Sequence, residues 1–468
     1  MNNRLKYLIK NLGILAVSNF SSKILVFLLV PLYTSVLSTT EYGTYDLIIS
    51  TVALLYPIAT LNIVDAVMRF CMEKTIRQKD VAAVGLKYIL LSIGIVGLGL
   101  MIFSLVNTFP SLNGLMVYIF LYFLFYVLNQ YFIQLAKGLE RITDMGIAGV
   151  VSTVVMISAN VILLLVFKMG LRGFFIAQIL GQAIPVCFLS IRLRFWNILR
   201  GSDICKPLEK QMLIYSIPLI CTGLGWWINS SADKYVVAAM CGVSANGILS
   251  VAYKIPSIIS TLQGIFTQAW SISAIKEYGE DSTADFYGKT FVYLNVMMSI
   301  ASACLIILSR PIARILYAND FYEAWQYVPF LLISSVCNCA SGFIGPILAA
   351  KKNSKTMAVS AIYGTVVNII LNIILVYFIG VQGATIATAV SSYIIYHYRM
   401  RAVKNELIVK EYWRILTTWS LLSLQAIIEV YTQFWYVEIV VIVVVIAVNR
   451  KVFRELAGGI SKYTGKSS

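Results

Sequence analysis

Stretches of about 20 apolar residues follow one another along nearly the whole chain, and each is long enough to span the hydrocarbon core of a bilayer. Backbone groups in lipid must be hydrogen bonded within their own segment, so these stretches are expected to be helices. We therefore predict an all-α integral membrane protein with about 14 transmembrane helices. The predicted spans are 12–35, 43–70, 83–106, 114–136, 145–167, 171–193, 211–232, 245–271, 287–309, 326–349, 357–379, 383–398, 413–430 and 434–449.

The composition agrees with a chain that lies mostly in lipid. Of the 468 residues, 59% are hydrophobic and 12% are charged, against about 25% charged residues in soluble proteins. The net charge of +16 would suit a nucleic-acid-binding protein, but the basic residues gather in alternate connecting segments, as the positive-inside rule describes. We therefore expect no nucleic-acid partner and both termini in the cytoplasm. The first apolar stretch is too long for a cleavable signal peptide, so it is expected to remain as a helix.

The residues that usually carry metal, redox or acid–base chemistry are scarce. The eight Cys form no CxxC pair and lie mostly in apolar stretches, which is typical of buried small hydrophobic residues. The single His, His397, lies at a predicted helix end. This pattern argues against a His-based metal site or a His catalytic base, and we expect no cofactor, no metal, no catalytic residues and no enzyme activity.

Two parts of the chain repeat each other. Residues 153–160 (TVVMISAN) align with 365–372 (TVVNIILN), and 170–173 (GLRG) align with 380–383 (GVQG). Six predicted helices separate the copies, so the repeats run parallel and would be related by a pseudo-two-fold axis along the membrane normal. Two facing six-helix lobes are a transporter architecture, and a duplicated scaffold or subunit is the alternative.

The repeats define the expected domains. We predict an N-terminal six-helix lobe at 1–200, a C-terminal six-helix lobe at 201–405, and two additional helices with a basic cytoplasmic tail at 406–468. The sequence assigns no role to the two additional helices.

Lys23 lies near the middle of the first predicted helix, where a charge costs about 2.5–3.5 kcal/mol on insertion scales. Asn19 and Ser22 share its helix face, four and one residues before it. The next predicted helix offers no acid at that depth. We therefore expect Lys23, Asn19 and Ser22 to face a watery central cavity that binds an anionic substrate.

Lys254 lies at a similar depth in the eighth predicted helix and is the second predicted substrate-binding cation. The alternative for either lysine is a distant carboxylate partner such as Glu429 or Asp233. Arg69 is a candidate substrate-binding residue or a cytoplasmic-end anchor, and it is the expected ion-pair partner of Asp65. Asp65 and Asp233 are also candidates for coupling to an ion.

Asn side chains inside the predicted helices fit a cavity for hydroxyl-rich cargo. Asn62 and Asn229 are the two candidates for substrate binding. The commoner use of Asn in membranes is a hydrogen bond to a neighbouring helix, and Asn160 and Asn372, at equivalent positions of the repeat, favour that packing role.

Several stretches resemble a known family. They are PLYTSVLSTTEYGTYDL, LNIVDAVMRF, ADKYVVAAMCGVSANGILSVAYKI and the N…G..GA.IAT pattern through Asn372, Gly380 and Gly383. With a central lysine in the first helix, they resemble the Wzx-type polysaccharide flippases of the multidrug/oligosaccharidyl-lipid/polysaccharide exporter (MOP) superfamily, over nearly the whole chain.

The resemblance implies a MATE-like fold with alternating access around a V-shaped cavity. It implies a flippase that moves an undecaprenyl-pyrophosphate-linked oligosaccharide from the inner to the outer leaflet of the bacterial cytoplasmic (inner) membrane, for O-antigen, capsule or exopolysaccharide. Lys23 and Lys254 would then balance the charge of the pyrophosphate. Membrane lipids are further partners, a polysaccharide polymerase and chain-length machinery are candidate partners, and we expect a monomer.

Three alternatives stay open from the sequence. A lipid II-type flippase of the same superfamily also has fourteen helices. A MATE-like drug/cation antiporter would favour acids rather than lysines at mid-membrane. A membrane polysaccharide polymerase or ligase would need large external loops and positioned acid–base groups, and this sequence has neither.

Overall fold

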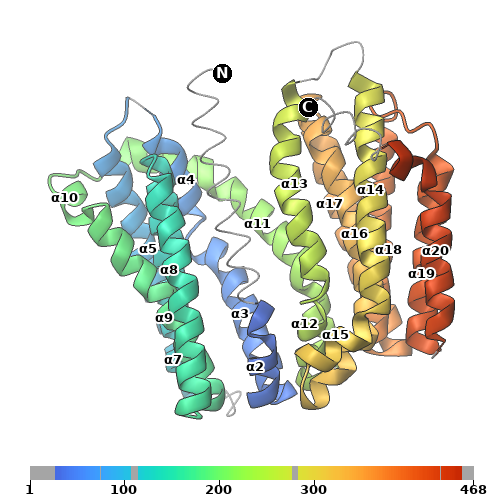
Figure 1. The fold of residues 1–468 in the computed structure, drawn as a ribbon. Helices are drawn as coiled ribbons and strands as arrows, with labels where there is room; N and C mark the ends of the chain where they lie inside the picture. Colours follow the sequence, from blue (N-terminus) through green and yellow to red (C-terminus); the bar gives the residue numbers. More distant parts are fainter. Residues whose placement is uncertain (1–26, 74, 107–113, 277–282, 433, 456–468) are drawn as a thin grey trace, which may run out of the picture. The chain divides into compact units, whose positions relative to one another are not determined.

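The computed structural model describes residues 27–73, 75–106, 114–276, 283–432 and 434–455, and every regular element in these ranges is a helix (Figure 1). Contacts between residues divide the chain into two compact units, Met1–Ser231 and Ala232–Ser468. The predicted all-helical membrane fold is confirmed.

The helices of the first unit follow the predicted spans. They are α2 (Val30–Val36), α3 (Thr39–Ala59), α4 (Ile63–Cys71), α5 (Gln78–Val106), α7 (Met116–Gly138), α8 (Ile142–Val161) with the π-helical extension η1 (Ile162–Val166), α9 (Gly170–Arg192) and α10 (Phe195–Leu199). Helix α11 (Lys206–Cys241) begins in the first unit and ends in the second.

The second unit contains the remaining elements. They are α12 (Val243–Ala252), α13 (Pro256–Lys276), α14 (Thr283–Ile307), α15 (Ser309–Leu316), the 3-10 helix η2 (Asn319–Tyr327), α16 (Val328–Ala350), α17 (Ser354–Ile379), α18 (Val381–Ala402), α19 (Tyr412–Tyr431) and α20 (Trp435–Val448).

Most of these helices are suited to a bilayer. Among the described residues, seven helices are long and apolar enough to cross a membrane, and three bent helix pairs meet the same conditions together. The bent pairs are α3 with α4, the two parts of α11, and α12 with α13. Helices α18, α19 and α20 occupy the predicted spans at 383–398, 413–430 and 434–449.

The helix predicted at 43–70 is broken, which the hydropathy pattern did not indicate. Helices α3 and α4 meet at 60°. Leu61 and Asn62 both have left-handed backbones, with φ of 51° and 50°. The N–H of Asn62 donates to the carbonyl of Pro57, and that of Leu61 to Ile58, which is the Schellman pattern of a helix C-terminus. A break at two non-glycine residues in this region of φ/ψ is costly, and such sites are often functional.

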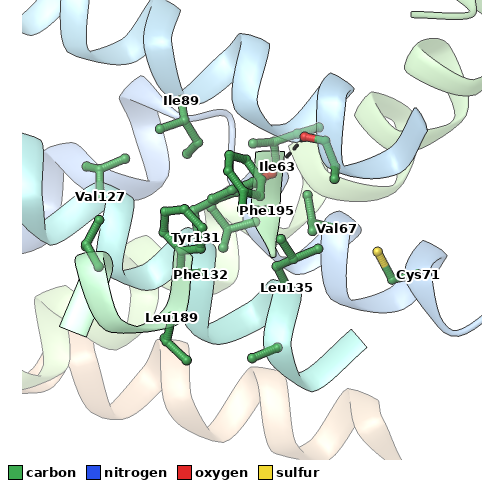
Figure 2. Packing of buried hydrophobic residues seen from close by; sticks show 14 of the residues in the cluster. Ile63, Val67, Cys71, Ile89, Val127, Tyr131, Phe132, Leu135, Leu189 and Phe195 are labelled. Carbon is green, nitrogen blue, oxygen red and sulfur yellow. Dashed lines mark hydrogen bonds between the residues drawn. The ribbon is translucent and has the colours of Figure 1, made fainter. Parts of the chain in front are cut away.

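The core of the first unit surrounds this break. Figure 2 shows Ile63 and Val67 of α4 packed with Tyr131 and Leu135 of α7, and all four side chains are fully buried. The Tyr131 hydroxyl donates to the carbonyl of Ala82 on α5, at 2.8 Å. This packing fixes α4 against α5 and α7, and therefore fixes the side chains that α4 carries.

The internal repeat is confirmed by equivalent backbone details. Gly170, the first residue of α9, and Gly380, the residue before α18, both have positive φ, 53° and 62°. A Cβ at Gly173 would lie 3.3 Å from the carbonyl oxygen of Leu163 on the preceding helix. A Cβ at Gly383 would overlap the backbone of Leu375, which is the matching residue of the second copy. The α8–α9 and α17–α18 hairpins are therefore two copies of one packed unit.

The repeated asparagines are buried like packing residues, but their side-chain amides bond their own helices rather than the neighbouring helix that the sequence favoured. Asn160 and Asn372 are completely buried. The Asn160 side-chain amide donates to the Met156 carbonyl at 2.7 Å, and that of Asn372 donates to the Asn368 carbonyl at 3.0 Å, in both cases four residues back on the same helix.

The predicted lobe boundary at 200/201 stays a prediction. In the structure, residues 201–231 belong to the first unit. Lys87 on α5 forms an ion pair with Glu209 on α11 at 2.6 Å. The Trp227 indole donates to the Ser50 carbonyl on α3, also at 2.6 Å. Helices α19 and α20, predicted as a separate segment, belong to the second unit and pack against α14.

Replacing Gly383 with alanine is expected to destabilise the protein by about 1–3 kcal/mol, since the new methyl group would overlap backbone atoms that cannot move independently. The measurement is thermal unfolding of the purified protein in detergent. Gly94→Ala is the matched control, because a Cβ at Gly94 on α5 meets no atom within 4 Å. Equal unfolding midpoints for the two variants would refute the close approach of α17 and α18.

Candidate functional site

Three of the predicted substrate-binding residues, Lys23, Asn19 and Ser22, lie outside the described residues and stay predictions. The other candidates divide between the two units, and each group is described within its own unit.

In the first unit, Asp65 is the centre of a polar cluster at the break between α3 and α4. Its two carboxylate oxygens accept from the Asn62 side-chain amide at 2.8 Å and from the Gln134 amide at 2.9 Å. Asn62 is 7% exposed, and Asp65 is half-buried. Both carboxylate oxygens of Asp65 therefore have an amide donor at the edge of an apolar core.

Local folding places Asn62 and Asp65 together. Asn62 is the residue before α4, and Asp65 lies in the first turn of that helix. The helix dipole favours a negative charge at this end. Gln134 then comes from α7, which packs against α4. The spacing of Asn62 and Asp65, three residues apart after Pro57, is a helix-start signal that sequence reasoning could have used.

Arg69 is not the partner of Asp65, and the prediction of that ion pair is wrong. Arg69 is exposed and pairs with Glu73, just beyond the end of α4, at 2.8 Å. Asp65 already receives two amide donors, and the Arg69 side chain reaches toward the loop that follows α4. The alternative of a cytoplasmic-end anchor stays a prediction.

In the second unit, Lys254 lies at the break between α12 and α13, which meet at 48°. Its side chain is half-buried, and its N–H donates to the Val251 carbonyl at 2.9 Å. The preceding residue, Tyr253, donates its hydroxyl to the buried carboxylate of Asp233 on α11. Lys254 at this break therefore directly follows a tyrosine whose hydroxyl is bound to a carboxylate.

The two units differ in the contact that corresponds to the Asp65–Gln134 hydrogen bond. In the first unit, the polar contact between α4 and α7 is the Asp65–Gln134 hydrogen bond. Between the corresponding helices of the second unit, α13 and α16, the Trp270 indole donates to the Phe343 carbonyl at 2.8 Å and stacks on the Phe343 ring at 4.1 Å. Only the first of these two contacts contains a charged group.

The last candidate residue, Asn229, lies exposed on the surface of α11. Within the described ranges, no three His, Cys, Asp or Glu side chains gather in a way that could hold a metal ion.

The profile of the polysaccharide biosynthesis protein family matches residues 8–272, more than half of the chain. The chain belongs to this family. A second profile, MatE, matches residues 218–374 of this polysaccharide biosynthesis protein. The two profiles together span both units.

Solved structures with the same fold are membrane transporters. The lipid II flippase MurJ, in an inward closed conformation, has a TM-score of 0.68 and 16% identity over 94% of this chain and 99% of its own. An inward-facing multidrug resistance MATE transporter of the MOP superfamily has a TM-score of 0.68 and 14% identity over 84% and 98%. The expected MOP superfamily fold is confirmed, and the Wzx-type branch stays a prediction.

Two more relatives come from archaea. A MOP superfamily transporter from Pyrococcus furiosus, whose binding pocket is described as having reversed polarity, has a TM-score of 0.58 and 14% identity over 85% of this chain and 96% of its own. The uncharacterized membrane protein MJ1375 of Methanocaldococcus jannaschii is 27% identical over 192 residues, 41% of this chain. That match spans 45% of MJ1375, less than half of its length.

Proposed function

We propose that this polysaccharide biosynthesis protein is a flippase for a polyprenyl-pyrophosphate-linked oligosaccharide. It moves the lipid-linked repeat unit from the inner to the outer leaflet of the cytoplasmic membrane by alternating access, for the synthesis of a surface polysaccharide. Both termini lie in the cytoplasm in this proposal.

One observation carries the proposal: the family match covers more than half of the chain, in a protein with the fold of a lipid II flippase. The related structures are flippases and transporters rather than enzymes. MOP transporters with this fold differ in the polarity of their binding pockets, so the cargo has to be argued from this chain's own charges.

The charges of the candidate site favour an anionic cargo. Lys254 lies where a spanning helix pair is interrupted, and interrupted helices of transporters often line the substrate site. A pyrophosphate group is the part of the cargo that Lys254 and Lys23 would bind.

The proposal predicts transport in proteoliposomes that hold a fluorescent polyprenyl-pyrophosphate oligosaccharide. Added quencher reaches lipid only in the outer leaflet, so transport raises the quenched fraction above one half. The protein is expected to accelerate this exchange for the pyrophosphate-linked lipid and not for the same glycan on an uncharged lipid. Equal acceleration of both lipids would exclude the charge-based selection, and no acceleration would exclude the flippase.

A lipid II-type flippase is the second candidate, and one observation favours it. The MurJ structure covers 94% of this chain, whereas the MATE structures cover 84% or 85%. The same assay with lipid II in place of the oligosaccharide lipid decides between the two cargoes. Drug-resistance transfer to a sensitive host, without lipid transport, would instead support the MATE-like antiporter.

A further inference from the structure

A buried polar cluster lies in the second unit where α15, α19 and α20 come together. Its members are Glu429 and Gln425 of α19, Glu438 of α20, and Ser309 and Arg310 of α15. Glu429 is 4% exposed, Glu438 is 1% exposed, and Gln425 is completely buried. Two acids buried this deeply require an explanation, because an uncompensated charge in an apolar core is costly.

Arg310 compensates one of the two acids. Its guanidinium lies 3.1 Å from Oε1 of Glu429, donates to the Thr432 carbonyl at 3.0 Å and stacks on the Trp325 ring at 4.2 Å. The Ser309 hydroxyl donates to the same Glu429 oxygen at 3.0 Å. The Oε1 atom of Glu429 therefore has both an ion-pair partner and a hydrogen-bond donor.

Glu438 has no such compensation of its own. It lies in the first turn of α20, Glu429 lies in the last turn of α19, and these two helices pack against each other, which brings the two buried carboxyl groups close enough to interact. Its Oε2 atom is buried and receives no donor, and the Oε1 atom of Gln425 is also buried without one. Gln425 uses its amide group on the Ala303 carbonyl of α14 at 3.0 Å. Two carboxyl groups in contact are both acceptors, so a hydrogen bond between them requires a proton.

Among the residues that the structure describes, the groups around Glu438 supply no further donor to Oε2. Helix α20 packs against α19 and α14. The charged groups acting on Glu438 are Glu429 beside it and, with a weaker effect, Arg310. Helix α14 contributes the Ala303 carbonyl, and the titratable residue next to it, Cys304, is exposed. One guanidinium and two carboxyl groups are electrically balanced when one proton is bound.

We propose that Glu429 and Glu438 form a proton-binding pair that joins α20 to α19 and α15. A proton fits better than a metal ion because the carboxyl groups already contact each other, and within the described residues no three acidic or metal-binding side chains converge on one point. The bound proton completes the hydrogen bond between the helices. Its loss leaves a second buried negative charge next to the first, and the two carboxylates then repel each other.

The first test is infrared difference spectroscopy of the purified full-length protein, where a protonated carboxylic acid has its own carbonyl stretching band. The wild type is expected to show this band at neutral pH, and Glu438→Gln is expected to lose it. Glu323→Gln is the matched control, because Glu323 is an exposed acid on η2, and it is expected to keep the band. A wild-type spectrum without a Glu438-dependent band would overturn the proposal.

The second test is the thermal midpoint of unfolding between about pH 5 and pH 9. The native state holds a proton that an unfolded, solvated carboxyl group releases near its ordinary pKa, so the wild-type midpoint is expected to fall as the pH rises. Glu438→Gln, which cannot release a proton, is expected to flatten this part of the profile, whereas Glu323→Gln is not. A profile unchanged by Glu438→Gln, or a midpoint that depends on sodium concentration instead of pH, would contradict the proton site. Neither test requires transport, so both are independent of the proposed cargo.

Discussion

Replacing Lys254 with alanine is expected to lower the rate of pyrophosphate-lipid transport by about 10- to 100-fold, while membrane insertion stays intact. In the proposed function, the substitution removes a charge-assisted hydrogen bond to a phosphate group, which is worth about 1.5–3 kcal/mol. Lys254 lies at the break between α12 and α13, and its side chain is half-buried. Lys23→Ala is expected to act in the same direction, and Lys23→Arg less strongly, because arginine keeps the charge.

The measurement is the proteoliposome quenching assay at matched protein density. Lys355→Ala is the control, since Lys355 is exposed at the beginning of α17 and lies outside the candidate site. The uncharged-lipid background should be identical in all variants. Full activity of Lys254→Ala and Lys23→Ala at normal protein levels would remove the argument that these lysines bind the pyrophosphate.

Replacing Asp65 with alanine is expected to reduce both stability and transport. The substitution leaves the amide groups of Asn62 and Gln134 without their acceptor, at a cost of about 1–3 kcal/mol for each buried group. It also removes the polar link between α4 and α7 beside a strained backbone break. Thermal unfolding measures the first effect, and the quenching assay measures the second.

Asp65→Asn separates the charge from the hydrogen bonds. Its amide oxygen can still accept from one of the two partners, so a stability loss smaller than that of Asp65→Ala is expected. If Asp65 couples transport to an ion, Asp65→Asn loses transport far more than stability. The control is Asp320→Ala, which removes an exposed acid on η2. Asp65→Ala variants as stable and active as this control would show that the cluster has no role.

The spans and the repeat follow from local properties of the chain. A helix in lipid satisfies its own backbone, so hydropathy alone indicates where helices lie. The repeated glycines, Gly173 and Gly383, could be predicted because glycine is needed wherever a helix approaches another backbone this closely. Asn160 and Asn372 are buried, but the predicted hydrogen bonds to a neighbouring helix are not what their amides form, because each amide finds a carbonyl one turn back on its own helix.

Long-range packing determines the partners of the buried polar groups and the position of the helix break, which the sequence alone did not predict. Asp65 and Arg69 have the spacing of a helix ion pair, yet Asp65 binds Gln134, 69 residues away, because α7 packs against α4. The interruption at Leu61 and Asn62 is stabilised by the core around α4, and no hydropathy pattern records it. Glu429 and Glu438 lie in separate helices and meet only when α19 folds against α20. Amino-acid order specifies which segments enter the bilayer, whereas the partner of a buried polar group depends on which helices become neighbours.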